Sequence, residues 1–205
     1  MKLRALYLIF FFLLAASFAR AQDYVPPPIA FHPNQQVRVG NLSLHTAQSS
    51  DPAAVLSAAL ATVFHDEDLC CGKGSALEDR VLASGSLSLR ILAGRLRGKQ
   101  TLGNGRSVRI SAEYLSPASV RAEQLLAPLM HHQPFLMQWN SRVYVVYGAV
   151  FDETLQSNGR RDYSIHKLLL FDPQRSPSPG ELSFDRQKDD WTKVEGLLLL
   201  KEERE

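Results

Sequence analysis

The chain has 205 residues and a formal net charge of +2, from 23 basic and 21 acidic side chains. A nucleic-acid-binding protein would concentrate its basic charge, and this chain does not, so we expect no nucleic-acid partner. The hydrophobic content of 45% is enough for a globular domain with a full core.

Residues 1–21 (MKLRALYLIFFFLLAASFARA) have the pattern of a secretory signal peptide. Lys2 and Arg4 give a basic start, residues 6–16 are apolar, and an Ala-x-Ala motif ends at Ala21. The apolar run is shorter than the roughly 20 residues of a membrane span. We therefore expect cleavage after Ala21 and an exported protein, periplasmic or secreted, that touches the membrane only through the uncleaved segment.

Residues 22–50 begin as a proline-rich, polar stretch, which predicts an extended N-terminal arm followed by a first strand. Residues 51–205 predict a single α+β domain. A helix is expected over residues 52–64, because Asp51 provides an N-cap and Pro52 fits the first helical turn.

The remaining elements are predicted from changes in the apolar periodicity. A second helix over residues 75–82 precedes a change at Ser86, where Leu87, Leu89 and Ile91 alternate with polar residues as in a strand. Further strands are predicted over residues 99–102, 107–112, 134–139, 143–151, 164–171 and 184–200, and a further helix over residues 117–131. Helices thus precede a sheet that the hairpins make antiparallel, which is the α+β class.

The two cysteines of the chain, Cys70 and Cys71, are neighbours. Their Cα atoms are about 3.8 Å apart, whereas disulfides favour roughly 4.4–6.8 Å, so a bridge between them would be strained. Two sulfurs of one dipeptide also seldom reach one tetrahedral ion, so we expect no metal. Three interpretations remain, which are a buried structural pair, a bond to another molecule, and a reactive thiol.

The residues after the two cysteines favour a reactive thiol. Gly72 and Gly74 would let a substrate backbone approach, and the helix expected after them would lower the thiol pKa through its N-terminal partial charge. A cysteine peptidase also needs a histidine to share the proton and a third group to orient that histidine.

The order of motifs in this chain resembles that of the papain-like cysteine peptidases, in particular the bacterial branch that includes bacteriocin-leader peptidases. The resemblance rests on Cys-Gly at 71–72, QPFLMQWNSRVYVVYG over residues 133–148 and KLLLFDP over residues 167–173. It covers roughly residues 53–173. It implies a papain-like fold, in which a helical half packs on an antiparallel β-sheet, and a catalytic centre without a cofactor.

Residue by residue, the resemblance implies that Cys71 is the nucleophile and that Asp172 is the orienting acid. The position of the family's histidine holds Arg142, and arginine stays protonated and cannot act as a general base. A hairpin centred near Ser157 would nevertheless place Arg142 opposite Asp172. His65 stands near the position of the family's oxyanion glutamine and could also reach Cys71 as an atypical base.

The other histidines have simpler interpretations. His131 and His132 are expected to close the helix over residues 117–131, where the helix dipole favours them. His166 is expected on the surface of the hairpin.

Three functions are compatible with these residues. The first is an exported protein of cysteine-peptidase descent that has lost or reduced its activity and binds a peptide or protein ligand. The second is an active thiol peptidase that uses Cys71 with an atypical base. The third is a non-catalytic structural module of the cell envelope.

Overall fold

The computed structural model describes residues 27–64, 88–101, 107–175 and 182–203. The predicted signal peptide, the helix predicted over residues 75–82, and both cysteines lie outside the described residues. The chain divides into two compact units, one formed by Met1–Phe31 with Thr154–Asp162 and the other by His32–Glu153 with Tyr163–Glu205. Among the described residues, no helix combines the length and apolarity needed to cross a bilayer.

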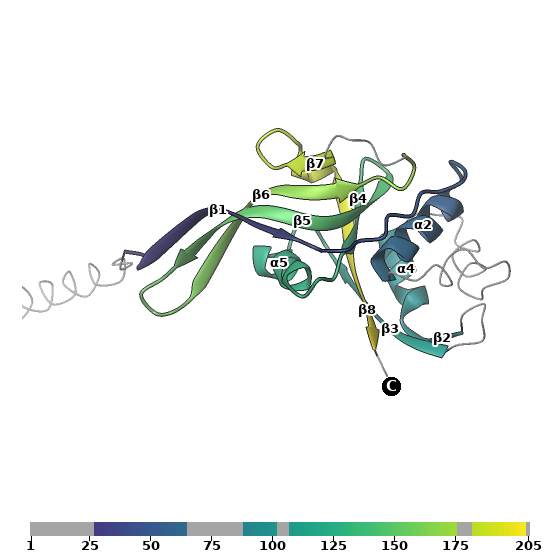
Figure 1. Ribbon diagram of the computed structural model, residues 1–205, viewed down its shortest axis with the longest axis horizontal. Coiled ribbons are helices and arrows are strands. Elements are labelled where there is room, and N and C mark those ends of the chain that lie inside the picture. Colours follow the sequence, from purple (N-terminus) through teal and green to yellow (C-terminus); the bar gives the residue numbers. More distant parts are fainter. Residues whose placement is uncertain (1–26, 65–87, 102–106, 176–181, 204–205) are drawn as a thin grey trace, which may run out of the picture. The chain divides into compact units, whose positions relative to one another are not determined.

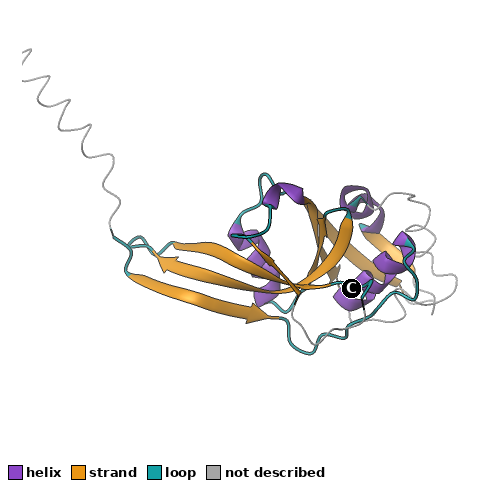
Figure 2. Ribbon diagram, turned by 90° about the horizontal axis from the view of Figure 1, so that it is seen from above, coloured by secondary structure: helices purple, strands orange, loops and turns teal. Residues whose placement is uncertain are grey.

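The described strands form one eight-stranded sheet in the order β2-β3-β8-β4-β5-β6-β7, with β1 paired to β5 (Figure 1). The strands are β1 (Ala30–Arg38), β2 (Gly98–Thr101), β3 (Ser107–Leu115), β4 (Phe135–Trp139), β5 (Arg142–Leu155), β6 (Arg161–Phe171), β7 (Leu182–Asp185) and β8 (Val194–Glu203). The registers of β2 with β3, of β3 and β4 with β8, of β4 with β5 and of β6 with β7 are antiparallel. Helices and an antiparallel sheet together confirm the predicted α+β class (Figure 2).

The first helix, α2 (Pro52–Phe64), begins as predicted. The carboxylate of Asp51 accepts a hydrogen bond from the Ala53 N–H at 3.2 Å, which satisfies one of the N-terminal donors that a helix leaves unpaired.

The strand predicted from Ser86 onward is wrong, because the described residues there form helix α4 (Leu89–Leu96). Its buried residues are Leu89, Leu92, Ala93 and Leu96, which are spaced as one face of a helix. Ile91, which the alternating pattern placed on the buried face of a strand, is 46% exposed.

The helix predicted over residues 117–131 begins later than expected, as α5 (Ala122–Met130). Ser116 starts a separate turn instead, in which its carbonyl accepts from the Ser119 and Val120 N–H groups at 3.1 Å. The indole N–H of Trp191 donates to the Pro117 carbonyl at 3.1 Å and so ties this turn to the residues before β8. Arg121 is the N-cap of the helix proper.

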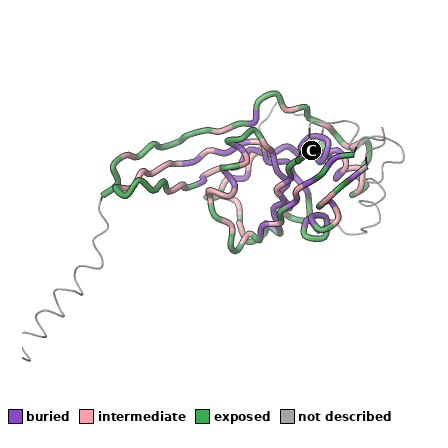
Figure 3. The backbone as a smooth tube through the Cα atoms, turned by 90° about the horizontal axis from the view of Figure 1, so that it is seen from below, coloured by how far each residue is buried: buried purple, intermediate pink, exposed green. Residues whose placement is uncertain are grey.

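Buried residues follow the strands and helices of the second unit (Figure 3). They form two hydrophobic clusters. In the first cluster, α2 and α4 pack on alternate residues of the central strands, among them Leu136, Val145 and Leu198. In the second, α5 packs on the other residues of the same strands, among them Met137 and Val146. Because neighbouring residues of a strand point to opposite faces, the helices of the two clusters cover opposite faces of the sheet.

One glycine of β8 is needed for packing. A Cβ at Gly196 would lie 2.5 Å from the ring of Tyr114, whose hydroxyl donates to the Glu195 carbonyl at 3.0 Å. The aromatic ring therefore takes the space that a side chain at position 196 would need.

In the first unit, the turn between β5 and β6 runs from Gln156 to Arg160. The Gly159 N–H donates to the Gln156 carbonyl, and the Gln156 N–H donates to the Arg160 carbonyl. Gly159 has φ of 80°, which suits a type I turn followed by a glycine bulge. The turn is therefore centred on Asn158, one residue after the predicted centre.

Candidate functional site

A tight turn places Arg142 at the start of β5. Asn140 and Ser141 have φ values of 49° and 59°, as a two-residue hairpin turn of the primed type requires. The carboxylate of Glu195 accepts from the Ser141 N–H at 2.6 Å and from the side-chain amide of Gln138 at 2.8 Å. Strand β8 thus holds the turn that presents Arg142.

A second turn places Asp172 directly after β6. The last four residues of that strand are buried, and Pro173 follows Asp172. One carboxylate oxygen of Asp172 accepts from the Gln174 N–H at 2.9 Å, and its carbonyl accepts from the Arg175 N–H at 3.0 Å. This is an Asx turn, in which the side chain of Asp172 takes the place of a backbone acceptor. Asp172 itself is only 5% exposed.

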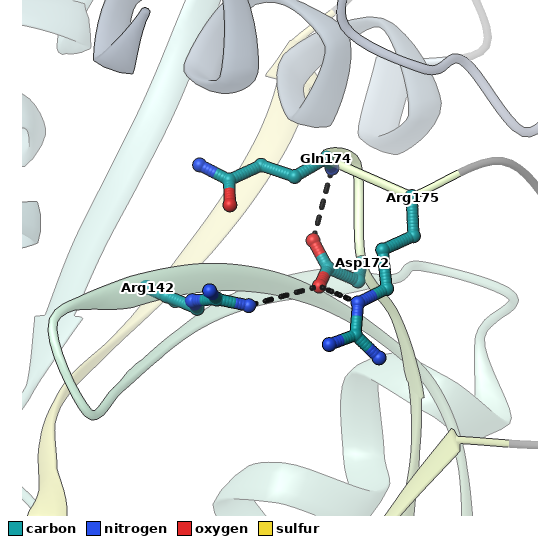
Figure 4. A network of polar contacts seen from close by, with 4 residues as sticks. All are labelled: Arg142, Asp172, Gln174 and Arg175. Atoms are coloured by element: carbon teal, nitrogen blue, oxygen red, sulfur yellow. Dashed lines mark hydrogen bonds and ion pairs between the residues drawn. The ribbon is translucent and has the colours of Figure 1, made fainter. Parts of the chain in front are cut away.

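Two arginines approach the other carboxylate oxygen of Asp172 from either side (Figure 4). Arg142 Nη1 lies 3.8 Å from Asp172 Oδ2, and Arg175 Nε lies 3.7 Å from the same atom. The arginine side chains are 48% and 69% exposed. The structure therefore brings Arg142 and Asp172 together and adds Arg175, which the sequence reasoning missed although it stands three residues after Asp172.

Tyr144 lies on β5 two residues beyond Arg142, so both side chains emerge on the same face of the strand. Burial raises the pKa of Tyr144 above its ordinary value, and the negative charge of Asp172 raises it further. The charge and hydrogen bond of Arg142 and the charge of Arg175 lower the pKa by smaller amounts. The phenol therefore stays neutral beside two cations and one carboxylate.

These groups are suited to holding charge rather than to moving protons. The guanidinium of Arg142 has no lone pair to accept a proton at any working pH. Asp172 has one oxygen in the turn and shares the other between two arginines. The cluster of Arg142, Asp172 and Arg175 can therefore orient an anion.

The other two predicted catalytic residues, Cys71 and His65, lie outside the described residues. Their catalytic roles, and their proximity to Arg142 and Asp172, stay predictions.

Another histidine forms a pair that sequence reasoning missed. His166 Nε2 lies 2.8 Å from Asp152 Oδ2, and the Asn34 N–H donates to the second oxygen of Asp152 at 2.8 Å. The Asn34 hydrogen bond first, and the His166 hydrogen bond second, lower the pKa of Asp152. His131 is the C-cap of α5, as predicted, and its N–H bonds to carbonyls of the last turn.

An open groove of about 270 Å³ lies where α5 ends beside β3 and β8. It is lined by Ser111, Glu113, Ala127, Pro128, His131, Gln133, Pro134, Phe135, Leu199, Leu200 and Lys201. The groove shares no residue with the Arg142–Asp172–Arg175 cluster.

Among the described residues, no group of three or more histidine, cysteine, aspartate or glutamate side chains is arranged to hold a metal ion. No protein-family model matches the chain, and no curated protein matches it either.

Proposed function

We propose that this protein is an exported, papain-like binding protein that holds a peptide or protein ligand without hydrolysing it. The observation that carries the proposal is the ion pair between Arg142 and Asp172. By the sequence resemblance, these residues occupy the positions of the histidine and of the acid that would orient it. An arginine paired with that acid fills the place of the proton-transferring group.

The loss of the base is large enough to abolish turnover. A positioned acid–base group contributes about 10²–10⁴-fold to rate. In the arrangement that the resemblance implies, the positive charge of Arg142 would favour the thiolate form of Cys71, but hydrolysis also needs a proton for the departing amine. Arginine does not supply that proton, since its pKa is above 12.

Among the described residues, no histidine forms an ion pair with Asp172. The ion pairs of Asp172 are with Arg142 and Arg175. His166 is occupied by Asp152, and His131 ends α5.

The proposal is tested with the full chain and a pool of fluorogenic peptides, under reducing conditions. We expect no hydrolysis by the wild type and measurable hydrolysis by Arg142→His. Adding Cys71→Ala to that variant should abolish the gain, whereas adding Cys70→Ala should keep it. Arg142→Lys is the matched control, because it changes the side chain and keeps the charge, and it should stay inactive.

Wild-type hydrolysis that disappears with Cys71→Ala would overturn the proposal in favour of an active thiol peptidase. The next residue to replace would then be His65. Retention of peptides by the wild type without hydrolysis supports binding, and the absence of both activities would leave a structural module as the better explanation.

A further inference from the structure

We propose that Arg142 and Arg175 form a binding site for a carboxylate, namely the C-terminal carboxylate of a peptide ligand. This inference rests on the proposed function, since it names the group of the ligand that the same site would recognise. The charges, distances and exposures around Asp172 support it.

Counted over the described residues, the cluster carries one positive charge more than it balances internally. The charged groups that act on the buried phenol of Tyr144 are Asp172, Arg142 and Arg175. Two guanidinium groups face one carboxylate, so one further negative charge would balance the cluster. A peptide carboxylate carries one negative charge, whereas a phosphate monoester carries between one and two at neutral pH.

Neither arginine uses a short hydrogen bond to hold Asp172, although Arg142 is hydrogen-bonded to Tyr144. Their distances of 3.8 and 3.7 Å to Asp172 Oδ2 are those of ion pairs and exceed the length of a hydrogen bond. Each guanidinium has five donors in a planar fork that matches a carboxylate. A ligand can therefore form charge-assisted hydrogen bonds without displacing Asp172.

The same contacts favour positions of the two arginine side chains close to Asp172. Asp172 is 5% exposed and held by the turn to Gln174, so its Oδ2 is a rigid negative centre. Arg142 is 48% exposed and Arg175 is 69% exposed, so both remain open to solvent. Asp172 thus pre-organises two accessible cations, which lowers the entropy that a ligand must spend on ordering them.

The experiment uses the immobilised full chain and two N-acetylated random hexapeptide libraries. One library has free C-terminal carboxylates, and the other has C-terminal amides. We expect the free acids to be retained at least about tenfold more strongly, as the loss of charge-assisted hydrogen bonds implies. Retention should fall with added salt.

Arg175→Gln should remove the preference for free acids. Because the Arg175 side chain is highly exposed, its replacement should not disturb folding, so a loss of preference reports on binding. Arg142→Gln should do the same. Arg160→Gln is the matched control, because Arg160 is also exposed and pairs with a carboxylate, that of Asp162, in the first unit. It should retain the free acids as the wild type does.

The outcomes separate this inference from the proposed function. Equal retention of acids and amides would refute carboxylate recognition and leave peptide binding intact. If neither library were retained, both the carboxylate site and the proposed peptide binding would be overturned. As competitors, sodium acetate and inorganic phosphate distinguish the source of the anion, and displacement by phosphate alone would assign the site to phosphate instead.

Discussion

Replacing the buried acid of the cluster separates its charge from its role in the turn. In Asp172→Asn, the side-chain oxygen can still accept the Gln174 N–H, so the Asx turn is kept. The negative charge that faces Arg142 and Arg175 is lost. In Asp172→Ala, both the charge and the hydrogen bond are lost.

The expected magnitudes are set by the distances and exposures. Two unit charges about 4 Å apart attract by about 4 kcal/mol at an effective dielectric constant of 20. Arginines that are 48% and 69% exposed are well screened, and pairs of this kind contribute about 0.2–1 kcal/mol each. We therefore expect Asp172→Asn to lower the free energy of unfolding by about 0.4–2 kcal/mol. Asp172→Ala should lower it by about 1 kcal/mol more, the usual net value of one hydrogen bond.

The assay is urea-induced unfolding of the full chain, followed by far-ultraviolet circular dichroism at low and at high salt. High salt should reduce the difference between wild type and Asp172→Asn, because it screens the arginines. It should leave the difference between the Asn and Ala variants unchanged. If Asp172→Asn were as stable as the wild type, the ion pairs would not contribute to the free energy of unfolding. If Asp172→Asn and Asp172→Ala were equally stable, the hydrogen bond of the Asx turn would not contribute to it.

Three further results are expected. Gly196→Ala should lower the unfolding free energy by about 1–3 kcal/mol, because its Cβ would meet the Tyr114 ring at 2.5 Å; Gly40→Ala, which has open space around it, should have a much smaller effect. The lowered pKa of Asp152 stabilises the fold above pH 3.8, and that contribution is lost as the pH falls through the folded-state pKa; Asp152→Asn should therefore make an acid-unfolding curve less steep. The raised pKa of Tyr144 gives stability that is fully present below pH 10 and is lost as the pH rises through the folded-state pKa; Tyr144→Phe should reduce alkaline unfolding and remove the phenol that titrates late in an absorbance titration.

The strands were predictable where the chain carries long apolar runs between turn residues. Residues 134–139, 143–151 and 164–171 were expected as strands, and they fall within or beside β4, β5 and β6. The strands β5 and β6 extend further than expected, because polar residues continue their pairing up to the turn at Asn158. These polar residues are not buried, so the apolar pattern of the sequence does not mark them as strand. Hydrogen bonds of the ladder, rather than apolar side chains, form these ends.

The helix α4 was missed because a short run of apolar residues fits the two-residue period of a strand as well as the helical period of about 3.6 residues. Leu89 and Ile91 alternate as in a strand, but Leu89, Leu92, Ala93 and Leu96 fit one helical face over a longer window. The start of α5 was misplaced for another reason. Ser116 and Pro117 have the composition of a helix start, but the contact with Trp191 holds them in a separate turn. That contact comes from residues more than seventy positions away and is not visible in the local sequence.

A hairpin centred near Ser157 predicted that Arg142 would lie opposite Asp172. The turn is centred on Asn158, which by the same count would set Arg142 opposite Gln174, but the side chains of Arg142 and Asp172 still form the predicted contact. Arg175 was missed because its approach depends on the Asx turn of Asp172, which bends the chain back within three residues. Tyr144 was missed as part of the cluster because its effect comes from burial, and only the packed structure shows that it is 7% exposed. Local turns and burial, rather than the order of motifs, therefore decide which side chains complete the site.

The presence of arginine rather than histidine at position 142 changes what the neighbouring acid does. Beside a histidine, a buried aspartate orients the ring and stabilises its charge only when the proton arrives. Beside Arg142 and Arg175, the charge is permanent, so Asp172 holds two cations at all times. A permanent cation that binds a non-reacting carboxylate of the ligand favours the ground state and the transition state equally, so that contact strengthens association without raising the rate of a chemical step. Both proposals therefore rest on the arginine at position 142, where the resemblance implies a histidine: an arginine transfers no proton, and it offers a carboxylate a permanent charge.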